Sequence, residues 1–219
     1  MSLNSLHDLY VDELRDLYNA ENQLIKALPQ MTKKASAQEL KDAFTQHLEV
    51  TRNQITRLET IFTELGTSPK GKKCKAMEGL IEEAKELLKE DGSPEVLDAA
   101  LIASAQRIEH YEIAGYGCVR TFARLLGFTD AEASLQETLD EEGDADKKLT
   151  ELAETIINVQ AGQADDDEGE DEDDEDEDAE DELDEEAEAD DTEEEDVEKT
   201  KVANKAGAAK GKSAAHAKK

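Results

Sequence analysis

The chain has 219 residues and a formal net charge of −32, and the charge is unevenly distributed. Residues 1–163 carry 30 acidic and 18 basic side chains, residues 164–198 carry 27 acidic and no basic ones, and residues 199–219 carry seven lysines and no acid. Only the first zone has enough apolar residues for a core. We therefore predict one domain over residues 1–163, then a disordered acidic segment and a disordered Lys/Ala-rich end.

Composition also excludes several classes of protein. No apolar run approaches the ~18 residues of a membrane span, and the N-terminal segment MSLNSLHDLY lacks the features of a secretory signal. Cys74 and Cys118 match no zinc-binding spacing and indicate reduced thiols, so we expect a cytoplasmic protein without membrane contact. The acidity of the first zone disfavours nucleic acid as a partner, except for weak contact through the lysines of residues 199–219.

Apolar residues recur with a helical period from the start of the chain. The first helix is predicted to run from Ser5 to Ala35, with Pro29 bending it or ending its regular part. The second is predicted to begin near Ser36, where Ser36 and Glu39 form a capping box, and to end at Gly66. These two long helices should form an antiparallel pair.

The rest of the first zone is predicted to be helical as well. A shorter helix covers Ala76 to Lys89, and the next opens with Ser93 as N-cap and Pro94 in its first turn, ending at Gly127. The last helix runs from Thr129 or Asp130 to about Val159. Four long helices, with a short one between the second and third, predict an all-α four-helix bundle with one long crossover connection.

Ionisable side chains interrupt the apolar stripe of every long helix. These are, in chain order, Glu21, His47, Glu109, Glu112, Glu142 and Asp146. An ionised carboxylate in a bundle core is costly unless it is paired, protonated or bound to a metal. Glu109 and Glu112 stand one turn apart on one face, where a shared cation would relieve their repulsion.

Alternatives remain for each of these side chains. Glu21 could be a boundary residue that reaches solvent, and the acids of the last two helices could be solvated. His47 could be a hydrogen-bonded core residue. Glu21, His47, Glu109 and Glu142 all lie near the middle of their helices, and this shared position favours a single metal site. Carboxylates with one imidazole suit iron or manganese. Bundles hold such ions as carboxylate-bridged pairs, so we predict a di-iron site, with manganese as the alternative metal.

Four segments carry a resemblance to a known family. They read FTQHLEVTRNQITRLE, KCKAMEGLIEEAKELL, ALIASAQRIEHYEIAGYG and LQETLDEEGDADKKLTELA, and they closely resemble the YciE/YciF family of ferritin-like proteins. The resemblance covers Leu6 to Asn158 without large gaps. It implies a ferritin-like bundle, a stress-linked role as a ferroxidase that oxidises Fe(II) at a di-iron site, and a homodimer. The Glu109-x-x-Glu112 pair is similar to the helix-three carboxylate pair of rubrerythrin.

The second helix departs from the family pattern at one position. The family motif reads His-Leu-x-Glu-Thr-x-x-Gln, and this chain has His47, Leu48, Thr51 and Gln54 but Val50 in place of the glutamate. The Glu-x-x-His motif of ferritins is absent as well. If the missing glutamate is a ligand in relatives, the resemblance implies a mononuclear or weakened site here.

Three functions follow from these observations. The first is a metal-dependent oxidation of Fe(II) with O₂ or peroxide. The second is a non-enzymatic helical stress protein that dimerises and binds partners through its tail. The third is a DNA-protecting protein that uses the basic end.

Overall fold

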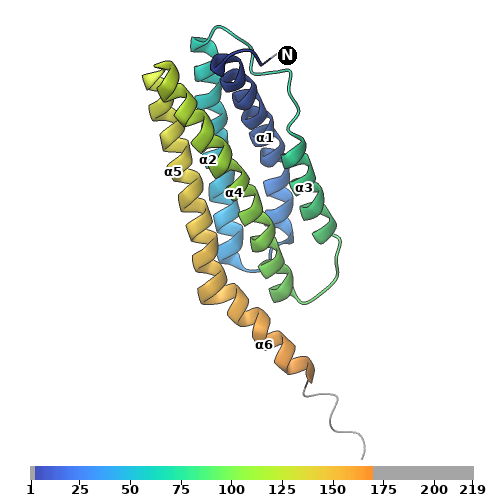
Figure 1. The fold of residues 1–219 in the computed structure, drawn as a ribbon. Helices are drawn as coiled ribbons and strands as arrows, with labels where there is room; N and C mark the ends of the chain where they lie inside the picture. Colours follow the sequence, from blue (N-terminus) through green and yellow to red (C-terminus); the bar gives the residue numbers. More distant parts are fainter. Residues whose placement is uncertain (1–2, 170–219) are drawn as a thin grey trace, which may run out of the picture. The chain divides into compact units, whose positions relative to one another are not determined.

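The computed structural model describes residues 3–169, and this part of the chain contains helices and connections but no strand (Figure 1). The elements are α1 (Leu6–Lys34), α2 (Gln38–Glu64), α3 (Lys75–Leu87), α4 (Pro94–Leu126), α5 (Thr129–Leu152), a π-helical turn η1 (Ala153–Ile157) and α6 (Asn158–Gly169). The predicted acidic and basic segments lie largely outside the described residues, although α6 continues past residue 163 to Gly169.

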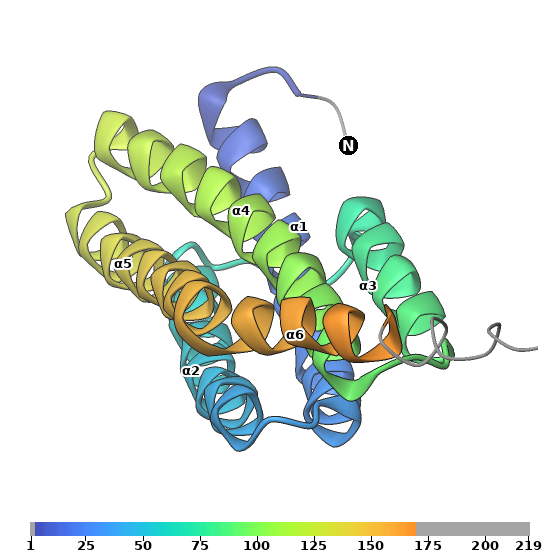
Figure 2. The same cartoon turned by 90° about the horizontal axis from the view of Figure 1, so that it is seen from below.

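Four long helices form the bundle. α1 packs against α2 and α4, and α5 packs against α4 and α2, so each helix has two neighbours around a common interior (Figures 1 and 2). The crossover between α2 and α4 carries α3, which packs against α1 and α4. The predicted all-α four-helix bundle, with an extra helix in its long crossover, is confirmed.

The boundaries of α4 follow the local sequence signals. The Ser93 hydroxyl accepts a hydrogen bond of 3.3 Å from the backbone N–H of Val96, and Pro94 occupies the first turn. Gly127 ends the helix with φ 81°, a left-handed conformation that glycine adopts without strain. Both predicted boundaries of this helix are confirmed.

The predicted capping box at the start of α2 is wrong. The N-cap residue is Ala37, which has no side-chain cap. Instead, the backbone N–H groups of Ser36 and Ala37 donate to the two carboxylate oxygens of Asp98 on α4, at 2.8 and 2.7 Å. Asp98 is buried, and its carboxylate accepts two charge-assisted hydrogen bonds that attach the connection before α2 to α4.

The bounds of α1 agree with the predicted range from Ser5 to Ala35, and the helix continues beyond Pro29 to Lys34, so proline does not end it. The last helix runs differently from the prediction. The predicted last helix is divided into α5, η1 and α6, because five residues from Ala153 to Ile157 adopt π-helical geometry. Turns of this kind are rare and often occur near functional sites.

The apolar core is divided into two clusters. One contains Leu24, Phe44, Ile108 and Leu149, and the other contains Leu17, Leu58, Tyr116 and Leu135. On each long helix the ionisable residues fall between a residue of the first cluster and a residue of the second. A polar layer therefore crosses the middle of the bundle.

Candidate metal centre

Four of the six predicted side chains converge in this polar layer. They are His47 from α2, Glu109 and Glu112 from α4, and Glu142 from α5, and we call them the His–Glu cluster. One nitrogen or oxygen atom from each lies within 4.8 Å of the others. All four side chains are buried, and His47 is the most exposed at 8%. Three helices thus bring one imidazole and three carboxyl groups to a common point.

His47 stands between two of the carboxyl groups. Its Nε2 atom lies 3.3 Å from Oε1 of Glu109 and 3.9 Å from Oε2 of Glu142. The first contact lacks hydrogen-bond geometry, so Nε2 has no hydrogen-bond partner. This imidazole nitrogen is therefore placed as a metal ligand would be, facing two carboxylates without donating to either.

Glu21 on α1 lies beside the His–Glu cluster rather than within the group of four. Its side chain is fully buried, and Oε1 accepts a hydrogen bond from the Tyr116 hydroxyl of α4. The other oxygen, Oε2, has no partner. Burial, and then the nearby charge of Glu142, raises the pKa of Glu21 well above its ordinary value. A fourth carboxyl group is therefore close enough to interact with the cluster.

The structure places Asp146 outside the group of four. Its side chain is 22% exposed, and its Oδ1 atom lies 3.1 Å from Nε2 of Gln106 and 3.3 Å from Nε2 of His110. His110 on α4 is itself 68% exposed. Asp146 is thus held at the edge of the bundle by two side chains of α4, and its role as a ligand stays a prediction.

Unpaired polar atoms are concentrated at this site. Within the described part of the chain, nine buried side-chain nitrogen or oxygen atoms have no hydrogen-bond partner. Six of them belong to Glu21 and the His–Glu cluster, and both oxygens of Glu112 are among them. Buried polar groups in folded proteins are nearly always paired. A set of oxygen atoms and one imidazole nitrogen left open in this way fits a hard divalent cation.

The electrostatics agree with this fit. Burial raises the pKa of Glu109 and Glu112 well above the ordinary value of 4.5, and neighbouring carboxylates raise it further. Burial likewise raises the pKa of Glu142 to about 7, although the hydrogen bond from Gln54 favours its charged form. Burial lowers the pKa of His47 to about 4, which keeps the imidazole neutral and its nitrogen available.

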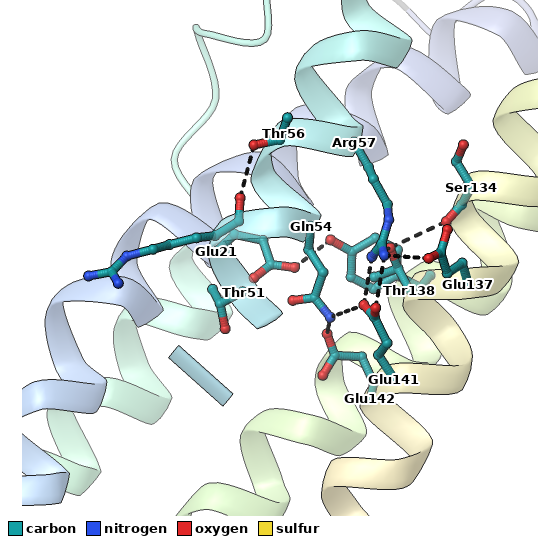
Figure 3. A network of polar contacts seen from close by, with 12 residues as sticks. Glu21, Thr51, Gln54, Thr56, Arg57, Ser134, Glu137, Thr138, Glu141 and Glu142 are labelled. Atoms are coloured by element: carbon teal, nitrogen blue, oxygen red, sulfur yellow. Dashed lines mark hydrogen bonds and ion pairs between the residues drawn. The ribbon is translucent and has the colours of Figure 1, made fainter. Parts of the chain in front are cut away.

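Three residues support the site from outside the predicted set (Figure 3). Gln54 on α2 is fully buried and donates from Nε2 to Oε1 of Glu142 at 2.6 Å. The same nitrogen lies 3.2 Å from Glu141, whose carboxylate accepts two hydrogen bonds from Arg57 at 2.6 and 2.8 Å. Gln54 follows His47 by seven residues, so its inward position is visible in the helical period, but its partner is not.

A pocket of about 330 Å³ opens beside the His–Glu cluster, between α2 and α5, and we call it the inner pocket. His47 and Glu109 line it, together with apolar side chains that include Phe44, Val50 and Leu149. Val50, which stands at the glutamate position of the family motif, therefore borders a space next to the cluster. The structure has no carboxylate at this position.

Comparison with known proteins identifies the family. A family model described as "Domain of unknown function (DUF892)" matches residues 5–162. The chain belongs to this family. Protein YciF of Escherichia coli K12 is 45% identical over 162 residues, which is 74% of this chain and 98% of YciF. The predicted membership of the YciE/YciF family is confirmed.

Solved structures agree. The crystal structure of the E. coli stress protein YciF gives a TM-score of 0.69 at 46% identity, over 71% of this chain and 98% of that one. YcfI of Rhodopseudomonas palustris gives 0.66 at 44% identity, over 68% and 95%. A protein of Xanthomonas campestris pv. campestris gives 0.59 at 20% identity, over 74% and 99%, and shows the shared fold alone. In this chain, which is a relative of YciF, no helix among residues 3–169 is long and apolar enough to cross a membrane.

Proposed function

We propose that the protein is a ferritin-like di-metal carboxylate protein of the cytoplasm that oxidises Fe(II) with O₂ or peroxide under stress. Iron is the proposed resident metal and manganese the alternative. One observation carries the proposal: six buried carboxylate and imidazole atoms of Glu21 and the His–Glu cluster have no hydrogen-bond partner, and one atom from each cluster residue lies within 4.8 Å of the others. Leaving these atoms unpaired is costly, and bound cations would remove the cost.

The proposed ligands have distinct roles. Glu109, Glu112 and Glu142 supply oxygen atoms, and the neutral His47 supplies Nε2. Glu21 lies beside them and is oriented by Tyr116. Four carboxyl groups and one imidazole approach the donor set that ferritin-like bundles use for two ions. Asp146 would join the set only by leaving Gln106 and His110.

The chain's own groups also control the surroundings of the site. Gln54 fixes one oxygen of Glu142, so the other oxygen faces the cluster. Phe44, Val50 and Leu149 add apolar surface to the inner pocket beside the cluster, and a less polar surrounding strengthens the interaction of the carboxylates with a cation. Resident metal ions would supply Lewis acidity and one-electron redox chemistry for the oxidation of substrate Fe(II).

An anaerobic titration with Fe(II) followed by exposure to air tests the proposal. A saturable ferric absorbance at about two irons per chain is expected, because this is the stoichiometry of a paired site. A mononuclear site would saturate at half that ratio. Catalysis additionally requires continued oxidation when Fe(II) is supplied beyond the saturating amount.

A matched pair of variants separates the bundle from the acidic segment. Glu109→Ala removes a cluster carboxylate and is expected to abolish the saturable signal. Glu49→Ala removes a glutamate that is 65% exposed on α2 and is expected to leave the signal intact. An unchanged signal in Glu109→Ala would reject the bundle site and assign iron binding to residues 164–198.

A second candidate is a non-enzymatic helical stress protein that forms a homodimer and binds partners through its tail. The descriptions of two relatives favour it, since one is called a stress protein and the other is proposed to be structural. The same Fe(II) experiment distinguishes the two candidates. Stoichiometric binding without turnover favours the structural role, in which a bound metal would only stabilise the bundle.

A further inference from the structure

A second pocket lies next to the inner pocket along α2 and α5. This outer pocket has a volume of about 290 Å³, and it shares Ala43, Gln46 and Lys148 with the inner one. The η1 turn contributes Thr155 and Ile156 to its wall, so the π-helical geometry after α5 helps to shape it. The two pockets are therefore contiguous along the groove between α2 and α5.

The inner pocket ends at unpaired ligand atoms. His47 and Glu109 line it, their side chains are 8% and 3% exposed, and His47 Nε2 and Glu109 Oε2 have no hydrogen-bond partner. A species that moved along the groove would thus reach the two side chains that carry these atoms, which lie just behind the pocket lining and out of contact with solvent. An imidazole nitrogen and a carboxylate oxygen are cation ligands.

The outer pocket has the charge of a cation-binding surface. Three carboxylates line it, from Glu39, Asp42 and Glu151, against one lysine, Lys148. The lysine ammonium lies 3.1 Å from Glu151. Asp42 accepts a hydrogen bond of 2.8 Å from the neutral amide of Gln38, so Lys148 leaves the negative charges of Glu39 and Asp42 to act on solvent ions. The pocket carries a net charge of −2 at its opening, and concave acidic surfaces concentrate cations and speed their association.

The dimensions also fit an ion with its water shell. Six waters at about 30 Å³ each occupy about 180 Å³, less than the volume of the outer pocket. Farther inward, the lining combines the apolar Phe44, Val50 and Leu149 with the carboxylates of Glu141 and Asp144, and it ends at His47 and Glu109, where dehydration would finish. The arrangement is an acidic outer pocket followed by an inner pocket of mixed lining that ends at two proposed ligands.

We propose that the groove between α2 and α5 is the path by which hydrated divalent cations reach the His–Glu cluster, with the outer pocket as a weak cation-binding vestibule. This inference rests on the proposed metal centre. It adds that Asp42 and Glu151 control the rate of loading without being ligands of the final site.

Stopped-flow uptake of Co(II) by the full chain tests the path. The observed signal is the visible absorption of bound Co(II), corrected with the Glu109→Gln variant, which lacks a cluster ligand. The test variant is Asp42→Asn with Glu151→Gln, which brings the net charge of the outer pocket from −2 to zero. Both side chains are exposed, so folding should be unaffected.

The vestibule predicts a kinetic change. In the double variant the association rate should fall by about three- to tenfold at low salt. The difference should shrink at high salt, because the attraction is screened. The amount of Co(II) bound at saturation should stay the same. The charge-matched control, Glu82→Gln with Glu83→Gln on α3, alters two exposed acids away from α2 and α5 and should load at the wild-type rate.

A steric variant tests the same path independently. Ala43 lines both pockets, and Ala43→Trp should slow loading at all salt concentrations while circular dichroism reports an intact bundle. Equal loading rates in wild type and in the Asp42→Asn/Glu151→Gln variant would overturn the proposed path. Loss of the Glu109-dependent signal from the wild type itself would instead overturn the proposed metal centre, so the two failures are distinguishable.

Discussion

Gln54 donates a 2.6 Å hydrogen bond to Glu142, which joins α2 to α5 inside the bundle. Both side chains are fully buried, and the bond leaves Oε2 of Glu142 facing His47. Gln54 also connects the site to the Glu141–Arg57 ion pair nearer the surface. One amide thereby fixes a proposed ligand and ties it to a second polar contact.

Loss of this amide should weaken metal binding. We expect Gln54→Leu to reduce the affinity for Co(II) by about 10- to 100-fold, the usual effect of removing a group that orients a ligand. Competitive titration with a chelator measures the affinity. Asn53→Leu is the matched control, because Asn53 is an exposed amide on the same helix. Equal affinities in the two variants would contradict the orienting role of Gln54.

The stability of the metal-free protein should decrease as pH rises. The carboxyl groups of Glu21, Glu109 and Glu112 have raised pKa values, and that of Glu142 is about 7. These groups bind protons more tightly in the folded state, so the stability they support is lost as pH rises through their folded-state pKa values. We expect Tm to be lower at pH 8 than at pH 6 by about 5 °C or more.

His47 acts in the opposite direction but in a different range. Its pKa is lowered from 6.5 to about 4, so its contribution is lost only as pH falls below 6.5. The interval from pH 6 to pH 8 therefore reports mainly the carboxyl groups. A Tm that stays constant or rises over this interval in metal-free protein would show that the carboxyl groups are not protonated in the folded state.

Bound metal should reverse the pH dependence. The ligands bind a cation in their deprotonated form, so affinity increases with pH and binding releases protons. With saturating Mn(II), we expect Tm at pH 8 to equal or exceed Tm at pH 6. Calorimetric titration in two buffers of different ionisation enthalpy measures the protons released. Release of no protons would contradict raised pKa values at the ligands.

Glu112→Gln should raise the stability of the metal-free protein while it weakens metal binding. Neither oxygen of Glu112 has a hydrogen-bond partner, and the side chain is fully buried. Its neutral replacement should stabilise metal-free protein at pH 8 by about 1–3 kcal/mol, because no charge is then buried. The same change should weaken metal binding. Chemical denaturation measures the first effect, with Glu83→Gln, a change of an exposed side chain on α3, as the neutral comparison. A less stable variant would show that Glu112 already has a partner.

Helical periodicity predicts much of this site because the direction of a side chain on a helix is a local property. Glu21, Glu109, Glu112 and Glu142 all follow the apolar stripe of their helices, and all four are buried. The register of each helix therefore places them at the same depth once the helices associate. Asp146, one turn beyond Glu142, also follows the stripe, but contacts with α4 hold it at the edge.

The features that the sequence does not reveal depend on contacts between distant residues. Gln54 could be placed inward, but its bond to Glu142 spans 88 positions. The vestibule requires α2 and the end of α5 to lie side by side, and the η1 turn has no distinct local signal. The connection before α2 is held by Asp98 from α4, a contact across 61 and 62 positions, so the local pattern of Ser36 and Glu39 wrongly predicted a capping box.

The attachment of the connection before α2 to Asp98 gives a final test. Asp98→Ala leaves the backbone N–H groups of Ser36 and Ala37 without their carboxylate acceptor in a partly buried connection. We expect a loss of about 2–4 kcal/mol, since each charged hydrogen bond contributes about 1.5–3 kcal/mol before partial rescue by water. Ser36→Ala removes the hydroxyl of the rejected capping box and should change stability by less than about 0.5 kcal/mol. Chemical denaturation of both variants gives the comparison. Equal losses, or a larger loss in Ser36→Ala, would restore the local cap and remove Asp98 from this role. Because Asp98 lies far along α4 from Glu109, metal affinity should be unchanged in both variants that remain folded.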